Sequence, residues 1–273
     1  MQHTGRTMEL EIETTAPPEQ AWTAWADPAH ISRWFTDRAS GDPQPGEIVY
    51  WSFDKFYQDV PYQVVAAVPF LQYALRFAPQ NRPPGLIEVR FAQSGSGTKI
   101  RLINSGFLHR GVWDEEFDGV LSGWKNALSL LKLYLESYFG RDKKTILVLR
   151  PTHFDFEELA PYFRSGEGLS FWLTKKGEMG LEGDAIAWKL RNRDKLTGKV
   201  LRLTGREAAL SWSEIEGALE LKAFSAGPSK RMLALRATTW SPSVDAAALE
   251  KFFQDSLDRL AECVEIEPEE VDT

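Results

Sequence analysis

The chain has 273 residues, of which 43% are hydrophobic and 12% aromatic, which is enough apolar material for the cores of two domains of ordinary size. Its net charge of -7 and its short, scattered basic clusters are not typical of proteins that bind nucleic acid, so we expect no such partner. Residues 1–6 are polar, and no apolar run approaches the roughly 20 residues that span a bilayer. We therefore expect a cytoplasmic protein without membrane insertion.

The first half of the chain predicts a strand, two short helices and then a series of strands. Leu10 and Ile12 alternate with glutamates, which is typical of a half-buried strand. The spacing of Trp22 and Trp25, and then of Ile31 with 34–35, predicts two short helices that each follow a proline. Apolar stretches divided by turn signals predict the strands 48–53, 62–68, 71–77, 86–91 and 100–107. Because no helix intervenes between them, an antiparallel sheet is favoured.

The clearest helix signal follows these strands. Apolar side chains recur every three or four residues from Trp113 to Leu135, which predicts one long amphipathic helix. Gly140 and the charged run 141–144 end it. A helix of this length needs a broad apolar surface to cover, and the preceding sheet supplies one.

The second half of the chain repeats this plan more loosely. A strand at 146–149 precedes short helical pieces at 154–163, which we expect to break at Pro161. Glycine-rich segments at 165–168 and 177–183 are predicted loops. A final helix, with an inner face from Val244 to Val264, follows strands at 185–190, 199–203, 208–212, 218–224 and 232–238. The repeated element order indicates duplication of a whole domain, and we place the domains at 1–142 and 143–273.

Two separated motifs resemble one branch of the START-like (SRPBCC) superfamily. The segment Ala16-Pro17-Pro18-Glu19-Gln20-Ala21-Trp22, followed by Trp25, Asp27-Pro28-Ala29-His30 and Trp34-Phe35, is similar to the opening of the C-terminal domain of the Aha-type activator of heat-shock-protein-90 ATPase. The positions Gly123-Trp124, Leu128, Leu131 and Tyr134-Leu135-Glu136 resemble the end of that family's terminal helix. The resemblance covers about residues 8–139, and over the second half it rests on element order alone.

The resemblance implies an α+β fold of two tandem helix-grip (START-like) domains, each a curved antiparallel sheet wrapped on a long C-terminal helix. In such folds the space between helix and sheet can be a cavity. We expect an apolar pocket there in the first domain, lined by Trp34, Trp51, Phe53, Phe77, Phe107, His109, Trp113, Trp124 and Leu128. The alternative is that the same rings fill the space completely. An inward-pointing arginine among Arg76, Arg90 and Arg101 could hold a ligand carboxylate, although outward-pointing arginines are commoner.

Residue patterns for metal, nucleotide or nucleophile chemistry are absent from the sequence. The four histidines lack metal-ligand spacing, and the single cysteine, Cys263, has no recognisable base beside it. The segment Ser94-Gly95-Ser96-Gly97 joins two strands and lacks the spacing of a phosphate-binding loop. We therefore predict no cofactor, no metal site and no catalytic residue.

The resulting hypothesis is a non-enzymatic binding protein whose first domain encloses a small apolar ligand, with the second domain as a filled structural companion. One alternative is a module that binds a protein partner, linked to chaperones or to the stress response; an exposed apolar patch would be its structural mark. Another alternative is an enzyme of the polyketide-cyclase kind, which the wider superfamily includes, with His109 and Asp114 as its acid–base pair. The sequence leaves the oligomeric state open.

Overall fold

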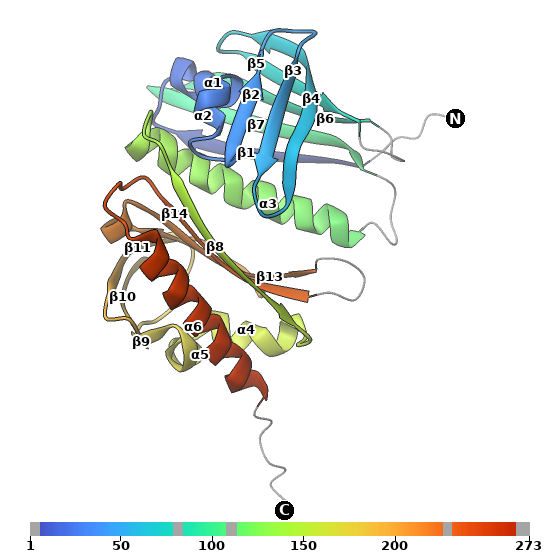
Figure 1. Cartoon of the computed structure of the whole chain (residues 1–273). Coiled ribbons are helices and arrows are strands. Elements are labelled where there is room, and N and C mark those ends of the chain that lie inside the picture. Colours follow the sequence, from blue (N-terminus) through green and yellow to red (C-terminus); the bar gives the residue numbers. More distant parts are fainter. Residues whose placement is uncertain (1–5, 79–83, 108–113, 226–230, 266–273) are drawn as a thin grey trace, which may run out of the picture. The chain divides into compact units, whose positions relative to one another are not determined.

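The computed structural model describes residues 6–78, 84–107, 114–225 and 231–265 (Figure 1). The chain divides into two compact units, Met1–Lys143 and Lys144–Thr273. Each unit contains one seven-stranded antiparallel sheet and ends in a long helix. The predicted α+β class, with two antiparallel sheets that each carry a C-terminal helix, is confirmed.

The first unit opens with a strand and two short helices, as the sequence predicts. Its elements are β1 (Arg6–Thr14), α1 (Pro18–Ala26), α2 (Pro28–Ile31), β2 (Arg38–Gly41), β3 (Ile48–Phe53), β4 (Tyr57–Val68), β5 (Gln72–Phe77), β6 (Gly85–Ser94), β7 (Gly97–Phe107), α3 (Asp114–Leu133) and a π-helical turn, Tyr134–Tyr138. The strand order in the sheet is β1-β7-β6-β5-β4-β3-β2. Consecutive strands from β2 to β7 therefore pair as a meander, and β1 closes the far edge beside β7.

Local sequence explains the start of this unit. Leu10 and Ile12 of β1 lie opposite Leu102 and Ile100 of β7, while the glutamates of β1 lie on the other face. Pro18 and Pro28 each occupy the first turn of a helix, where a missing N–H breaks no hydrogen bond. The prediction that the second helix includes residues 34–35 is wrong. Helix α2 ends at Ile31, and the chain then turns through three hydrogen bonds to the Ile31 carbonyl.

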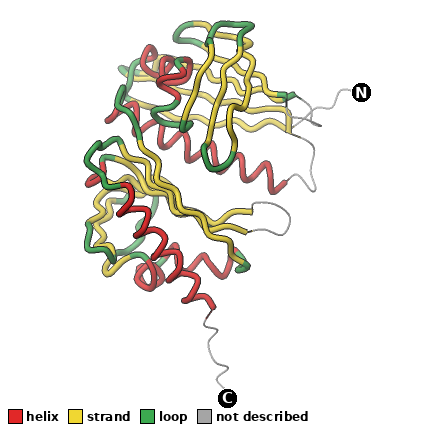
Figure 2. The backbone as a smooth tube through the Cα atoms, in the orientation of Figure 1, coloured by secondary structure: helices red, strands yellow, loops and turns green. Residues whose placement is uncertain are grey.

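Helix α3 runs along one face of the first sheet (Figure 2). Among the strands, β1 has the most extensive contact with its backbone. The predicted apolar stripe faces the sheet, and Trp124, Leu128 and Leu131 are buried on it. The helix passes into the π-helical turn at Tyr134, which is completely buried.

The second unit has the same sequence of elements. They are β8 (Lys144–Thr152), α4 (Phe156–Arg164), α5 (Gly166–Trp172), β9 (Thr174–Lys176), β10 (Ala185–Leu190), β11 (Lys195–Leu203), β12 (Glu207–Trp212), a 3-10 turn (Ser213–Ile215), β13 (Gly217–Ser225), β14 (Arg231–Thr239) and α6 (Ala246–Glu265). Its strand order, β8-β14-β13-β12-β11-β10-β9, follows the same connectivity as that of the first unit. The two units therefore share one topology.

Two predictions for the second unit are wrong. The segment 165–168 is the start of α5 rather than a loop, because the Ser165 hydroxyl caps the helix by accepting a 2.9 Å hydrogen bond from the Gly168 amide. Glycine at 168 also lets α4 and α5 approach, since a Cβ there would lie 2.3 Å from the Pro161 carbonyl oxygen. Helix α4 continues through Pro161 because Leu159 and Phe163 are buried in the core on either side of it.

None of the helices in the described ranges combines the length and the apolar character that crossing a membrane requires. The cytoplasmic location stays a prediction.

Candidate functional site

The space between α3 and the first sheet is occupied by a connected set of aromatic rings centred on Phe35. The Phe35 ring stacks on Trp124 of α3, with centroids 5.0 Å apart and planes 17° apart. It also lies 5.2 Å from Trp34 and 5.4 Å from Trp51. Phe53 makes a further edge contact with it at 5.2 Å. Four residues of the predicted pocket thus meet around a ring that the prediction did not place in it.

The predicted pocket residues differ in burial along this network. Trp34, Trp51, Trp124 and Leu128 are buried. From Trp51 the ring contacts continue to Tyr62 at 4.4 Å and from Tyr62 to Phe77 at 6.0 Å. Phe107 contacts Phe117 of α3 at 5.2 Å. The rings of Phe53, Tyr62, Phe77 and Phe107 are only half-buried. Two predicted residues, His109 and Trp113, lie outside the described residues.

The inner face of α3 shows the same gradient along the helix axis. The residues that face the sheet from Trp124 to Leu135 are buried, but Phe117, Val120 and Leu121 in the first turns are only half-buried. Helix α6 of the second unit differs. Its inner residues are at most 6% exposed over its described length, from the first turn onward: Leu249, Phe252, Phe253, Leu257 and Leu260. The inner residues at the start of α3 are therefore less completely buried than those of α6.

Two glycines make room for the half-buried rings. Gly106 has φ +96° at a bulge where the β1–β7 register shifts, a conformation that favours glycine. A Cβ there would lie 2.6 Å from the Gly85 Cα. The bulge brings Phe107 to the helix side of the sheet, where it contacts Phe117. A Cβ at Gly85 would lie 2.2 Å from the Phe77 ring, so Phe77 occupies the space above that glycine.

One buried polar side chain on this face has an atom without a hydrogen-bond partner. Asn104 of β7 is 3% exposed and lies between Met8 of β1 and Ile87 of β6 in the register of the sheet. Its side-chain oxygen Oδ1 is buried and accepts no hydrogen bond. Asn104 was not among the predicted site residues, although its alternation with Ile100 and Leu102 places it on the inner face.

A second polar group lies at the half-buried end of the same face. Burial raises the pKa of the Tyr62 phenol to about 12, with a further contribution from nearby Tyr57. The Tyr62 hydroxyl is therefore protonated at neutral pH and can donate a hydrogen bond.

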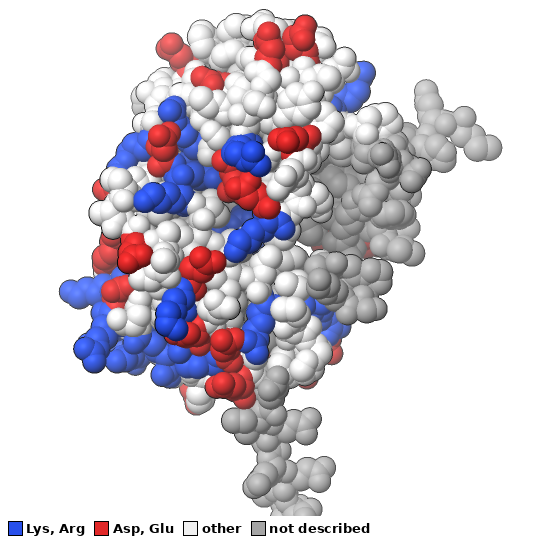
Figure 3. All heavy atoms as spheres, in the orientation of Figure 1, with Lys and Arg blue, Asp and Glu red and all other residues white. Residues whose placement is uncertain are grey.

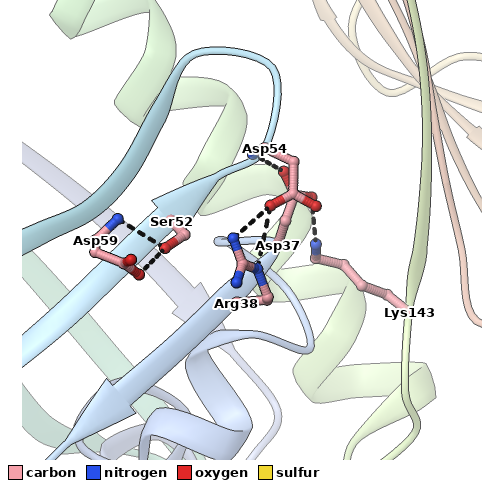
Figure 4. A network of polar contacts seen from close by, with 6 residues as sticks. All are labelled: Asp37, Arg38, Ser52, Asp54, Asp59 and Lys143. Carbon is pink, nitrogen blue, oxygen red and sulfur yellow. Dashed lines mark hydrogen bonds and ion pairs between the residues drawn. The ribbon is translucent and has the colours of Figure 1, made fainter.

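Polar contacts on the outside of the sheet hold the strands that carry Trp51 and Phe53. Ser52 stands between these two residues on β3, and its hydroxyl donates to Asp59 Oδ1 of β4 at 2.8 Å (Figure 4). The Asp59 amide donates back to the Ser52 hydroxyl at 2.9 Å. These reciprocal bonds fix the β3–β4 hairpin. Because side chains alternate between the faces of a strand, they leave the two aromatic rings pointing inward.

The neighbouring part of this network ties the edge strand β2 to the same hairpin. The Asp54 amide donates to Asp37 Oδ2 at 3.0 Å, and the Arg38 guanidinium pairs with the Asp54 carboxylate at 3.2 Å (Figure 4). The Lys143 ammonium lies 3.5 Å from the Asp37 carboxylate. Charge is thus balanced at this edge of the sheet, away from the aromatic interior.

The arginines considered as ligand-binding residues do not point into this interior. Arg90 pairs with Glu88 at 2.5 Å and Arg101 pairs with Glu9 at 2.6 Å, on the face of the sheet opposite to α3. Arg76 is exposed. The inward-arginine hypothesis is therefore not supported by any of the three.

Of the hypothetical acid–base pair, Asp114 lies within the described residues. The carboxylate of Asp114 forms an ion pair with Arg6, whose guanidinium lies 3.8 Å from the centroid of the Phe117 ring. His109 lies outside the described residues. Within the described ranges, no three His, Cys, Asp or Glu side chains are grouped so that they could hold a metal ion.

The second unit carries a row of like charges on its surface. Lys189 of β10 lies opposite Lys195 of β11 and opposite Lys176 of β9, and all three side chains are exposed. Lys and Arg side chains gather over this part of the second unit (Figure 3). Like charges at facing positions of a sheet are destabilising.

The fold and this interior define the first unit as a helix-grip domain of the START-like type. Residues 15–136 match the family described as "Activator of Hsp90 ATPase homolog 1-like protein". The match lies within the first unit and includes both sequence motifs, so the resemblance seen in them is confirmed. The match ends at residue 136, so the relation of the second unit to the family stays a prediction.

Solved structures with similarity to the chain include three that cover one or both units. CalU16 from Micromonospora echinospora is 21% identical, with a TM-score of 0.41 over 49% of this chain and 78% of that chain. The Aha1 dimer from Colwellia psychrerythraea is 19% identical, with a TM-score of 0.44 over 50% and 99%. DynU16, from the dynemicin biosynthetic locus, is 18% identical, with a TM-score of 0.41 over 94% and 98%. A comparison with curated proteins found no match.

Proposed function

We propose that the first unit binds a small apolar molecule between the start of α3 and the inner face of its sheet. The observation that carries the proposal is the partial burial of Phe117, Val120 and Leu121 at the start of α3, where Phe117 contacts the half-buried ring of Phe107. Apolar surface that is left uncovered inside a domain costs free energy, at about 25 cal/mol per Å². A bound apolar molecule would recover that free energy.

The second unit supports the proposal by contrast. It has the same topology, yet its helix α6 is buried against its core from the first turn to the last described one. The fold itself therefore does not require a half-buried helix start. We assign ligand binding to the first unit and a structural role to the second.

The proposal is tested by measuring binding in two matched tryptophan variants of α3. N-phenyl-1-naphthylamine, a neutral fluorescent probe of two linked aromatic groups, is titrated into the full chain. Val120→Trp fills the half-buried inner position and is expected to weaken binding about tenfold or more. Asp118→Trp places the same side chain on an exposed position of the same turn and is expected to change binding less than about twofold. Equal effects of the two variants, or no probe binding to the unaltered chain, would contradict the proposal.

Native mass spectrometry of the gently purified chain gives an independent test. A bound small molecule should appear as an added mass that disappears after extraction with organic solvent. The Val120→Trp chain, purified in the same way, should carry much less of it. Its retention at the level of the unaltered chain would place the molecule elsewhere.

A second candidate function is binding of a protein partner through the turn between β4 and β5. Val68, Phe70 and Leu71 are 42%, 43% and 61% exposed, which gathers apolar surface at one tip of the unit. Phe70 adopts φ +64°, a left-handed conformation that is unfavourable for a bulky residue. Its ring contacts Trp22 at a centroid distance of 5.9 Å.

This second function is tested by affinity capture with the double variant Phe70→Asn, Leu71→Ser. Asparagine tolerates the left-handed conformation, so the turn is expected to keep its shape while it loses its apolar surface. A protein partner of this turn would be captured by the unaltered chain and by Val120→Trp but not by the double variant. Partners that all three chains capture equally would refute a role for the turn.

A further inference from the structure

Asn104 carries an unsatisfied polar atom on the inner face of the sheet, between apolar register neighbours. At 3% exposure, its Oδ1 is removed from water and accepts no hydrogen bond. Its register neighbours, Met8 and Ile87, cannot donate one from their side chains. Buried polar atoms are nearly always hydrogen-bonded in folded proteins, so an orphan at this position needs a physical explanation.

Other buried polar residues of the same face are satisfied. Thr98, on the same strand and completely buried, donates from its hydroxyl to the Ala16 carbonyl at 2.7 Å. Thr14 of β1 accepts from the Ala16 amide at 3.3 Å. The inward polar groups near Thr98 therefore have hydrogen-bond partners. Asn104 Oδ1, which lies nearer the half-buried rings, has none.

The charged strand residue on the helix side near Asn104 is Arg6, whose guanidinium is already paired with the Asp114 carboxylate of α3. The other ion pairs of this region belong to the opposite face: Glu9 with Arg101, Glu88 with Arg90, and Lys99 with Glu11. An ionised ligand group would have to compete with Asp114 for Arg6 or lose its hydration without a compensating charge, and both are unfavourable. A neutral hydrogen-bonding group would meet the open amide without that penalty.

We infer that the Asn104 amide is the polar anchor of the ligand site, and that the ligand is a neutral apolar molecule with a hydrogen-bonding group such as a hydroxyl, carbonyl or N–H. This inference rests on the proposed function and adds a chemical class to it. The apolar rings supply contact area, and the amide fixes the orientation of the molecule because it is the polar partner at that depth. Asn104 is thereby a specificity-determining residue.

The anchor is tested with two probes that differ in one hydrogen-bond donor. N-phenyl-1-naphthylamine has an N–H group that can donate to Asn104 Oδ1, and its N-methyl derivative lacks it. The unaltered chain is expected to prefer the N–H probe by about three- to tenfold. Asn104→Leu should abolish this preference, whereas Thr98→Val, a matched polar-to-apolar change on the same strand, should preserve it. A preference that survives in Asn104→Leu, or that is absent from the unaltered chain, overturns the anchor.

The neutral character of the ligand is tested by competition at pH 8. Dodecanol should displace the probe at a concentration about tenfold or more below that of dodecanoate, which has the same chain but an ionised head. Equal competition by the two would overturn the inference about charge. Absence of probe binding to the unaltered chain would instead remove the proposed function itself, so the two failures are distinguishable.

Discussion

Replacement of Asn104 by leucine is expected to stabilise the protein in the absence of ligand. Asparagine and leucine are similar in size, and the site is 3% exposed, so the change removes a buried Oδ1 without a partner and leaves an apolar side chain among Met8 and Ile87. An unsatisfied buried acceptor costs about 1–3 kcal/mol. We therefore expect the free energy of unfolding to rise by about 1–3 kcal/mol, which for a unit of this size is an increase in Tm of about 3–10 °C.

The matched variant Thr98→Val should have the opposite sign. Thr98 faces the same interior from the same strand, but its hydroxyl donates to the Ala16 carbonyl. Valine breaks this bond and leaves that carbonyl without its partner, which should lower the free energy of unfolding by about 0.5–1.5 kcal/mol. Two polar-to-apolar substitutions six residues apart should thus differ in sign because one hydroxyl is satisfied and one amide is not.

Both variants are measured in the full chain by urea unfolding and by calorimetry, with and without the N–H probe. The unaltered chain should gain stability when a saturating probe is added, and Asn104→Leu should gain less, because a ligand stabilises only in proportion to its affinity for the folded state. If Asn104→Leu is less stable than the unaltered chain without ligand, the amide is satisfied in solution and the reasoning fails. An equal gain from the probe in both chains would argue against a role for Asn104 in binding.

Three further changes test other parts of the structure. Burial outweighs the opposing effect of Asp27 and lowers the pKa of His30, so the folded state binds a proton less readily than the unfolded state. The free energy of unfolding should therefore fall as the pH drops below 6.5, and it should fall less in His30→Gln. Urea midpoints at pH 7.5 and 5.5 measure this difference. Gly168→Ala should destabilise the second unit by about 1–3 kcal/mol in calorimetry, because its Cβ would meet backbone, whereas Gly205→Ala meets nothing within 4 Å and should stay within about 0.5 kcal/mol. Lys189→Glu places an acid between two lysines and should raise the free energy of unfolding by about 0.2–1 kcal/mol at low salt. This gain should shrink at high salt, because salt screens exposed charges. The first prediction is contradicted if His30→Gln leaves the pH dependence of stability unchanged, and the second if Gly168→Ala and Gly205→Ala destabilise equally. The third is contradicted if the stability gained in Lys189→Glu does not depend on salt.

Regular periodicity is what made the larger elements predictable. The two-residue alternation around Leu10 and the long stripe ending at Leu135 gave β1 and α3, because those patterns mark which face is buried. The edge strands β2 and β9 have four and three residues, too few for a pattern. They form because β3 and β10 offer unpaired backbone groups beside them. Helix α5 was missed because Gly166 and Gly168 disfavour helix locally, and the cap and the close approach of α4 outweigh that preference.

The candidate site was predictable in composition but not in arrangement. The sequence identified Trp51, Phe53 and Trp124 as rings beneath the helix, but their common contact with Phe35 depends on how the turn after α2 sits between β3 and α3. That placement is a property of tertiary packing and has no local signature. Asn104 was recognisable from the sequence, because Ile100 and Leu102 precede it on the same face of the strand and are apolar and buried. An asparagine at the next inward position breaks this apolar pattern.

Such conflicts are informative because they oppose stability. A sequence selected for stability alone would place an apolar residue at 104, as the strand does at Ile100 and Leu102, and would cover Val120 as the second unit covers the inner face of α6. The unsatisfied amide and the half-buried helix start both occur in the first unit, near the half-buried end of one sheet face. Each of these two features lowers the stability of the empty domain. A neutral molecule that covers the rings and forms a hydrogen bond with the amide would explain both. Asn104→Leu should therefore raise the free energy of unfolding of the ligand-free chain and weaken its binding of the ligand.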